Sequence, residues 1–135
     1  MDEAKRDLVK AWLIKAQHDL ASARKLSVEP EPYLDTAIYH CQQAAEKAIK
    51  AFLFFHDQRF DKTHDLRPLI GLAQPLDTRF SSFLQAAVLL TPYASEFRYP
   101  GDFIDPTREQ FDEALSAADS VWQFVLSVLP AEVHP

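Results

Sequence analysis

The sequence predicts an all-α protein: an up-and-down bundle of four long helices and one short helix, forming a single domain over residues 1–135. Apolar residues recur at every third or fourth position through several long segments, which is the period of a helix with one buried face. The chain has only two glycines, which argues against a sheet with tight hairpins. Its nine prolines fall outside the periodic segments, where they separate helices.

The central helix is expected from Leu34 to about His56. Its apolar face is wide and rich in alanine, and this indicates a helix at the centre of a bundle, where small side chains let neighbours approach closely. Cys41, the only cysteine, lies on this face and is expected to be a buried small hydrophobic residue. The face comprises Leu34, Ala37, Ile38, Cys41, Ala44, Ala45, Ala48, Ile49, Phe52, Leu53 and Phe55.

The first helix is expected from about Asp2 to Leu26. Leu8 belongs to its predicted apolar stripe, whereas Asp19 is expected to face outwards. The prolines at positions 30 and 32 follow this helix and cannot continue it.

Two further helices are expected in the middle of the chain. A short one begins at Thr63 or His64. A longer one follows from about residue 77, with Leu84 on its apolar stripe, and Pro92 ends or kinks it.

The last helix is expected to start at Asp105 as the N-cap, with Pro106 at the first position. A capping box formed by Thr107 and Gln110, one turn later, is the alternative. In both cases Pro130 ends the helix.

Composition excludes several kinds of function. A formal charge of −6 argues against nucleic-acid binding over the whole surface, although a local basic patch remains compatible with it. The five histidines never pair at metal-binding spacing, and two glycines leave no phosphate-binding Gly loop, so neither metal nor cofactor is expected. The charged N-terminus and the lack of a long apolar run predict a cytoplasmic protein without a membrane span.

A polar cluster on the central helix is open to two interpretations. Gln43, Glu46, Lys47 and Lys50 share one helix face. They form either a solvated face, with a Gln43–Lys47 contact and a Glu46–Lys50 ion pair, or a polar strip that lines a groove or a dimer seam.

Two interpretations also fit the sequence around His64. Thr63 or Asp65 can cap the short helix that follows. Alternatively, His64 lies in a pocket together with Arg98 and Tyr99, where an imidazole can exchange protons near neutral pH.

Three segments carry a family resemblance. The runs YHCQQAAEKAIKAFL, KTHDL and EFRYPGD, in this order and at this spacing, resemble the HEPN domain family, particularly its small stand-alone prokaryotic members. The resemblance extends from Trp12 to Leu129. It implies a bundle of four or five helices, usually a homodimer, and a minimal nucleotidyltransferase as partner, often in a toxin–antitoxin pair. It also implies nucleotide binding, and many members are metal-independent ribonucleases.

The nuclease members carry an Arg-x4–6-His motif near the start of a late helix. The literal match in this sequence, from Arg59 to His64, lies between the second and third predicted helices instead. At the late position Arg98 and Tyr99 stand without a nearby histidine. An enzymatic activity is therefore left open, and the sequence favours its absence.

Three functional hypotheses follow. The first is a homodimeric module that acts with a nucleotidyltransferase and binds a nucleotide or RNA. Its expected ligand-binding residues are Lys47, Lys50, His64, Asp65 and Arg98.

The alternatives assign other roles to the same segments. In a metal-independent ribonuclease toxin, His64 would be the acid–base, with Arg59 or Arg98 stabilising charge, and Tyr99 would be a further catalytic candidate. In a non-catalytic dimerisation scaffold, Glu46, Arg98 and Tyr99 would hold helix junctions together.

Overall fold

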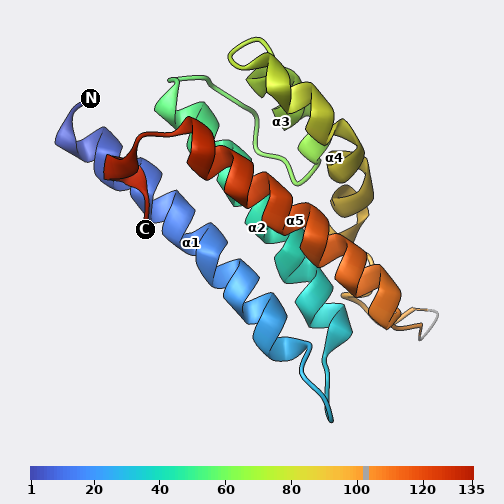
Figure 1. Ribbon diagram of the computed structural model, residues 1–135. Helices are drawn as coiled ribbons and strands as arrows, with labels where there is room; N and C mark the ends of the chain where they lie inside the picture. The colour runs from blue at the N-terminus through green and yellow to red at the C-terminus, as the bar shows by residue number, and fades with distance from the viewer. Residues whose placement is uncertain (102–103) are drawn as a thin grey trace.

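The computed structural model describes residues 1–101 and 104–135, and within these residues it contains helices and no strand. The predicted all-α class is confirmed. The five α-helices are α1 (Glu3–Leu26), α2 (Leu34–Phe55), α3 (Leu66–Ala73), α4 (Leu84–Leu90) and α5 (Arg108–Val128) (Figure 1). Three short 3-10 segments accompany them: η1 (Thr78–Phe83), η2 (Thr91–Ala94) and η3 (Ala131–Val133).

Helix α2 lies at the centre of the bundle, as the alanine-rich stripe predicts. It packs against α1 along one side and against α5 along another, and the shorter α3 and α4 complete the bundle (Figure 1). Fourteen of its residues are buried, including polar ones. The central helix of this fold therefore determines where every other helix lies.

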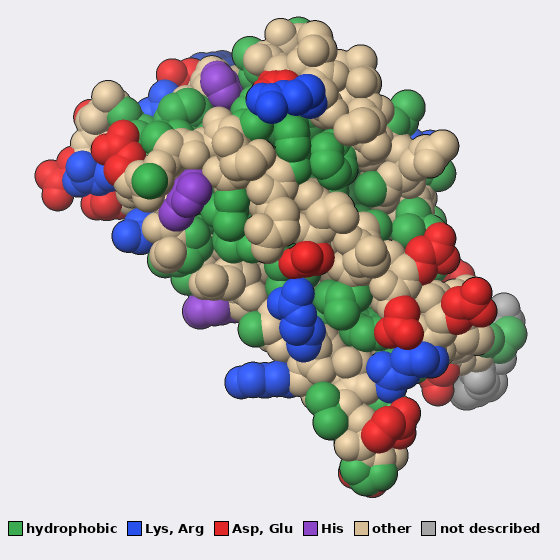
Figure 2. All heavy atoms as spheres, viewed as in Figure 1, with side chains coloured by type: hydrophobic (Ala, Val, Ile, Leu, Met, Phe, Trp, Pro, Cys, Tyr) green, Lys and Arg blue, Asp and Glu red, His purple; other side chains and the backbone are tan. Residues whose placement is uncertain are grey.

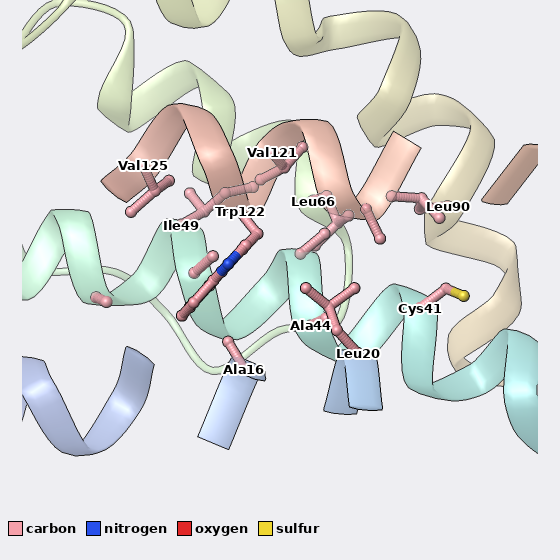
Figure 3. Close-up of a cluster of buried hydrophobic side chains, with 14 of the residues drawn as sticks. Ala16, Leu20, Cys41, Ala44, Ile49, Leu66, Leu90, Val121, Trp122 and Val125 are labelled. Atoms are coloured by element: carbon pink, nitrogen blue, oxygen red, sulfur yellow. The ribbon is translucent and has the colours of Figure 1, made fainter. Parts of the chain in front are cut away.

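The core brings together alanines and larger apolar side chains from all three long helices. Trp122 of α5 belongs to the same buried cluster as Ala44 of α2 and Ala16 of α1, and its ring extends from α5 into that cluster (Figure 3). Because alanine side chains are small, the helix backbones approach closely around this indole.

The first helix differs from its prediction in which residues face the core. Asp2 caps α1, its Oδ1 accepting a hydrogen bond from the Lys5 backbone N–H at 2.8 Å. The expected burial of Leu8 is wrong, because Leu8 is 46% exposed and the adjacent Val9 is fully buried. Val9 continues the spacing of Leu13 and the later core residues, so the buried stripe begins one position later than predicted.

The fourth helix is shorter than predicted. The segment from residue 78 onwards begins as the 3-10 helix η1, becomes α-helical only at Leu84, and returns to 3-10 geometry at Thr91. A 3-10 helix has fewer residues per turn than an α-helix, so the apolar positions rotate where one changes to the other. As a result Leu84, expected in the core, is 50% exposed.

Side-chain caps set the starts of α3 and α5, whereas α2 begins after Tyr33 without one. Helix α3 begins at Leu66, slightly later than expected, with Asp65 as its N-cap. Helix α5 uses the capping box rather than the start at Asp105: Thr107 Oγ1 accepts from the Gln110 N–H at 3.0 Å, and Gln110 Oε1 accepts from the Thr107 N–H at 2.9 Å.

The buried state of Cys41 gives a first testable prediction. Its side chain is fully buried, and desolvation raises the pKa of the thiol to about 12. The native protein is therefore expected to resist alkylation at about pH 8, where an exposed thiol reacts readily, and to take up one label per chain in denaturant. Mass spectrometry after timed labelling measures both states. Rapid labelling of the native protein would contradict the buried position.

Candidate functional site

A buried carboxylate organises the polar side of α2. The Glu46 side chain is 6% exposed, and its Oε2 accepts a hydrogen bond from Lys50 Nζ at 3.1 Å. Its Oε1 accepts from Gln42 Nε2 at 3.2 Å and lies 2.9 Å from His64 Nδ1. The expected Glu46–Lys50 ion pair is therefore present, but the expectation that it lies on a solvated face is wrong.

The same cluster attaches the segment before α3 to α2. Lys50 Nζ also donates to the Thr63 carbonyl at 3.2 Å, and Gln42 Nε2 donates to the His64 carbonyl at 2.9 Å. Buried charges are tolerated when partners satisfy their hydrogen bonds. This cluster, Gln42, Glu46, Lys50 and His64, thus joins two parts of the chain through polar contacts.

A second buried carboxylate lies between α1 and α2. Asp19 Oδ2 accepts from Lys47 Nζ at 2.6 Å, and Asp19 Oδ1 lies 2.7 Å from His40 Nδ1. The prediction that Asp19 faces outwards is wrong, since only 9% of its side chain is exposed. The predicted Gln43–Lys47 contact is also replaced, because Gln43 Nε2 donates to Gln42 Oε1 at 2.8 Å.

Arg98 lies over an aromatic ring of α2. The carbon at the centre of its guanidinium is 4.0 Å from the ring centroid of Tyr39, within the range of a cation–π interaction. Its Nη1 donates to the Ala94 carbonyl at 3.3 Å. The ring centroid of Tyr99 is 5.7 Å from the same guanidinium carbon, and Tyr99 is 71% exposed.

Arg98 and the second cluster meet at one pocket of about 290 Å³. Because His40 Nδ1 is bonded to Asp19, Nε2 is the ring nitrogen that remains for a molecule in the pocket. An arginine and an oriented imidazole in one pocket can bind an anion and exchange a proton with it. The lining residues are Asp35, Thr36, Tyr39, His40, Phe97 and Arg98. We call this the Arg98 pocket.

The structure does not bring His64 together with Arg98 and Tyr99. His64 contacts Glu46, and neither the Arg98 pocket nor the adjacent cavity of about 730 Å³, which Arg98 and Tyr99 line, includes it. Asp65 acts as a helix cap, accepting from the Arg67 backbone N–H at 3.0 Å. Side-chain hydrogen bonds from Arg67 lower the pKa of Asp65 below its ordinary value. The capping interpretation of this segment is therefore the one that the geometry supports.

The five residues expected to bind a ligand thus lie in different surroundings. Lys50 is buried in the Glu46 cluster, Lys47 is bonded to Asp19, and Asp65 is bonded to Arg67. His64 and Arg98 are more exposed and lie apart. Of the five, Arg98 is the one that lines a pocket with a second functional side chain.

The described residues do not assemble a metal site. Among them, no group of three or more histidine, cysteine or acidic side chains is placed to hold a metal ion. Nor does any helix in the described part of the chain combine the length and apolar character that a membrane crossing requires.

Comparison with known proteins identifies the family to which this chain belongs. The model of the HEPN domain matches residues 9–128, so the chain belongs to the HEPN domain family, as the resemblance implies. A comparison with curated proteins gave no match.

Two solved structures are similar over nearly their whole length. TT1696 from Thermus thermophilus superposes with a TM-score of 0.76 at 28% identity, covering 90% of this chain and 98% of its own. ST0689, described as an archaeal HEPN homologue, superposes with a TM-score of 0.67 at 26% identity, covering 88% and 95%.

Sequence reasoning missed Asp19, Tyr39 and His40. One indication was available: His40 and Lys47 are about two helical turns apart and so share a face of α2. Another was the position of Asp19 between Ala16 and Ala23, at helical spacing from both and therefore on the buried side of α1.

The Glu46 cluster gives a second testable prediction. Glu46→Gln keeps the size of the side chain but leaves the Lys50 ammonium buried without a counter-charge, so we expect a loss of about 3 kcal/mol in the free energy of unfolding. Urea denaturation followed by circular dichroism measures it. Asp112→Asn, the same chemical change on the exposed side of α5, is the control and is expected to change stability by about 0.5 kcal/mol or less. Equal effects of the two substitutions would contradict a structural role for Glu46.

Proposed function

We propose that this chain is a cytoplasmic, homodimeric HEPN module that binds the phosphate of a nucleotide or RNA in the Arg98 pocket and acts with a minimal nucleotidyltransferase in a toxin–antitoxin-like pair. The observation that carries the phosphate-binding part is the position of Arg98, held over Tyr39 in the same pocket as His40. The homodimer and the nucleotidyltransferase partner are supported by membership of the family and by what the resemblance implies.

Arg98 is suited to an anion because it is exposed and makes few hydrogen bonds of its own. In the described structure one nitrogen donates to a backbone carbonyl, at 3.3 Å. The remaining N–H groups can form the paired hydrogen bonds that arginine makes with phosphate. Stacking on Tyr39 holds the guanidinium plane without using those N–H groups.

His40 and Tyr99 can add contacts to a bound nucleotide besides those that Arg98 makes with its phosphate. His40 lines the pocket, and since Asp19 occupies Nδ1, Nε2 is the ring nitrogen left to contact a ligand. The exposed ring of Tyr99 offers a surface on which a base can stack. A nucleotide, which carries both a phosphate and a flat base, matches this combination better than a simple anion does.

The charge distribution favours a local site over a general nucleic-acid surface. The net charge is −6, and on the face formed by α1 and α5 acidic and basic side chains are interspersed (Figure 2). Non-specific phosphate binding requires a concentration of basic side chains. Binding is therefore proposed at one pocket, where a few oriented groups suffice.

The third testable prediction concerns this pocket. Arg98→Ala is expected to weaken binding of AMP or a short RNA by about ten- to a hundredfold, since a hydrogen bond between charged groups contributes about 1.5–3 kcal/mol. Isothermal titration calorimetry measures the affinity. Arg67→Ala removes an exposed arginine on α3 that does not line the pocket and is the matched control. Unchanged binding in Arg98→Ala, or an equal loss in Arg67→Ala, would contradict the assignment.

A second candidate function, a metal-independent ribonuclease, is favoured by the Asp19–His40 contact. A buried carboxylate that fixes one imidazole nitrogen leaves the other to accept the proton of a ribose 2′-hydroxyl. Arg98 would stabilise the negative charge as the 2′-oxygen bonds to phosphorus and the 5′-oxygen leaves. The Glu46–His64 contact has the same form, but His64 lies outside the Arg98 pocket.

The fourth prediction separates the ribonuclease from the binding module, by incubation of RNA with the protein in EDTA. If the protein is a ribonuclease at this pocket, His40→Asn and Arg98→Ala lose cleavage by about a hundredfold or more, while His64→Asn retains it. Cleavage lost in His64→Asn alone would move the site to the Glu46 cluster. Intact RNA with the wild-type protein, together with measurable binding, would leave the binding module as the function.

A further inference from the structure

Helix α4 exposes two large apolar side chains that neither the core nor the Arg98 pocket explains. Leu84 is 50% exposed and Val88 is 54% exposed, and they lie one turn apart on the same helix. Among the large hydrophobic side chains exposed by the described residues, this is the one pair with i, i+4 spacing on a single helix. Such a pair forms a continuous apolar ridge.

The ridge borders a groove of about 870 Å³ between α4 and α5. On the α5 side the groove is lined by small residues, Ser116, Ala117 and Ser120 (helices in Figure 1). Small side chains on one helix beside an apolar ridge on another allow a third helix to pack closely between them. The groove is well supported, because the ring of Phe83 packs against Phe124 with centroids 4.8 Å apart.

The charge at the groove has one sign. Glu113 is the charged residue that lines it, and Glu109, one turn earlier on α5, is also acidic and exposed. Helix α4 itself carries no charged residue. Glu113 is the one carboxylate among the lining residues, beside the uncharged polar side chains of Ser82, Gln85, Ser116 and Ser120. The apolar surface of the groove is therefore supplied mainly by the α4 side, and its negative charge by the α5 side.

We propose that this groove binds an amphipathic helix of a partner protein, with large apolar residues at i, i+4 spacing and lysine or arginine on its flank. The apolar residues would pack on Leu84 and Val88, and the basic flank would face Glu113. A second copy of this chain fits less well. A two-fold contact places the same patch on both sides and so brings the Glu113 carboxylates of the two copies towards each other.

The test uses two labelled helical peptides of about 20 residues with the same leucine-rich face, one flanked by lysine and the other by glutamate. Fluorescence anisotropy is expected to show binding of the lysine peptide to the wild-type protein and about tenfold weaker binding to the double variant Leu84→Gln, Val88→Thr. Glu113→Lys is expected to reverse the preference and favour the glutamate peptide. Glu132→Lys makes the same charge change on η3, outside the groove, and should leave the preference unchanged.

Two results would overturn the proposal. One is equal binding, or no binding, of the two peptides to the wild-type protein. The other is a dimer in light scattering that the double variant dissociates, because the groove would then be occupied by a second copy. Circular dichroism confirms that each variant is folded, and Glu113→Lys tests the charge preference without altering the apolar ridge. Nucleotide binding in the Arg98 pocket should be unaffected, so this proposal and the proposed function fail independently.

Discussion

The burial of a charged carboxylate on the central helix is the constraint on which much of this structure depends. Glu46 lies inside the bundle, where an ion without partners would be strongly unfavourable. Lys50, Gln42 and His64 all approach it, and two of them also bind backbone carbonyls of the segment before α3. The segment before α3 therefore follows a path that places hydrogen-bond partners around the Glu46 side chain.

Helix α2 thus has a hydrophobic side that builds the core and a polar side that organises the surface. The polar side contributes to two carboxylate clusters of similar composition, each with a lysine and a histidine; Asp19 comes from α1 and His64 from the segment before α3. They differ in their surroundings: the Asp19 cluster borders the Arg98 pocket, whereas the Glu46 cluster fastens a loop. Two similar residue sets built around α2 therefore have different roles, which depend on the elements that lie beside each of them.

The sequence was sufficient for features that depend on local spacing. The all-α class, the extent of α2 and the burial of Cys41 all follow from helical periodicity. The start of α5 was less certain, since the capping box at Thr107 was only the alternative to a start at Asp105. The sequence was insufficient where the deciding partner is distant in the chain. Asp19 contacts a residue of α2, so its burial depends on how α2 packs beside α1. The cation–π contact between Arg98 and Tyr39 also joins residues of separate elements. The outward turn of Leu84 depends on a change of helix type that periodicity alone does not reveal.

The contacts of Asp19 have a mechanical consequence for the pairing of α1 with α2. One carboxylate joins two groups about two turns apart on the neighbouring helix, so it lies between them along the helix axis. A slide of either helix by one turn, about 5.4 Å, would carry Asp19 away from at least one partner. The two contacts of Asp19 therefore fix the axial register of α1 against α2. Without them, the alanine-rich interface of these helices would permit several registers.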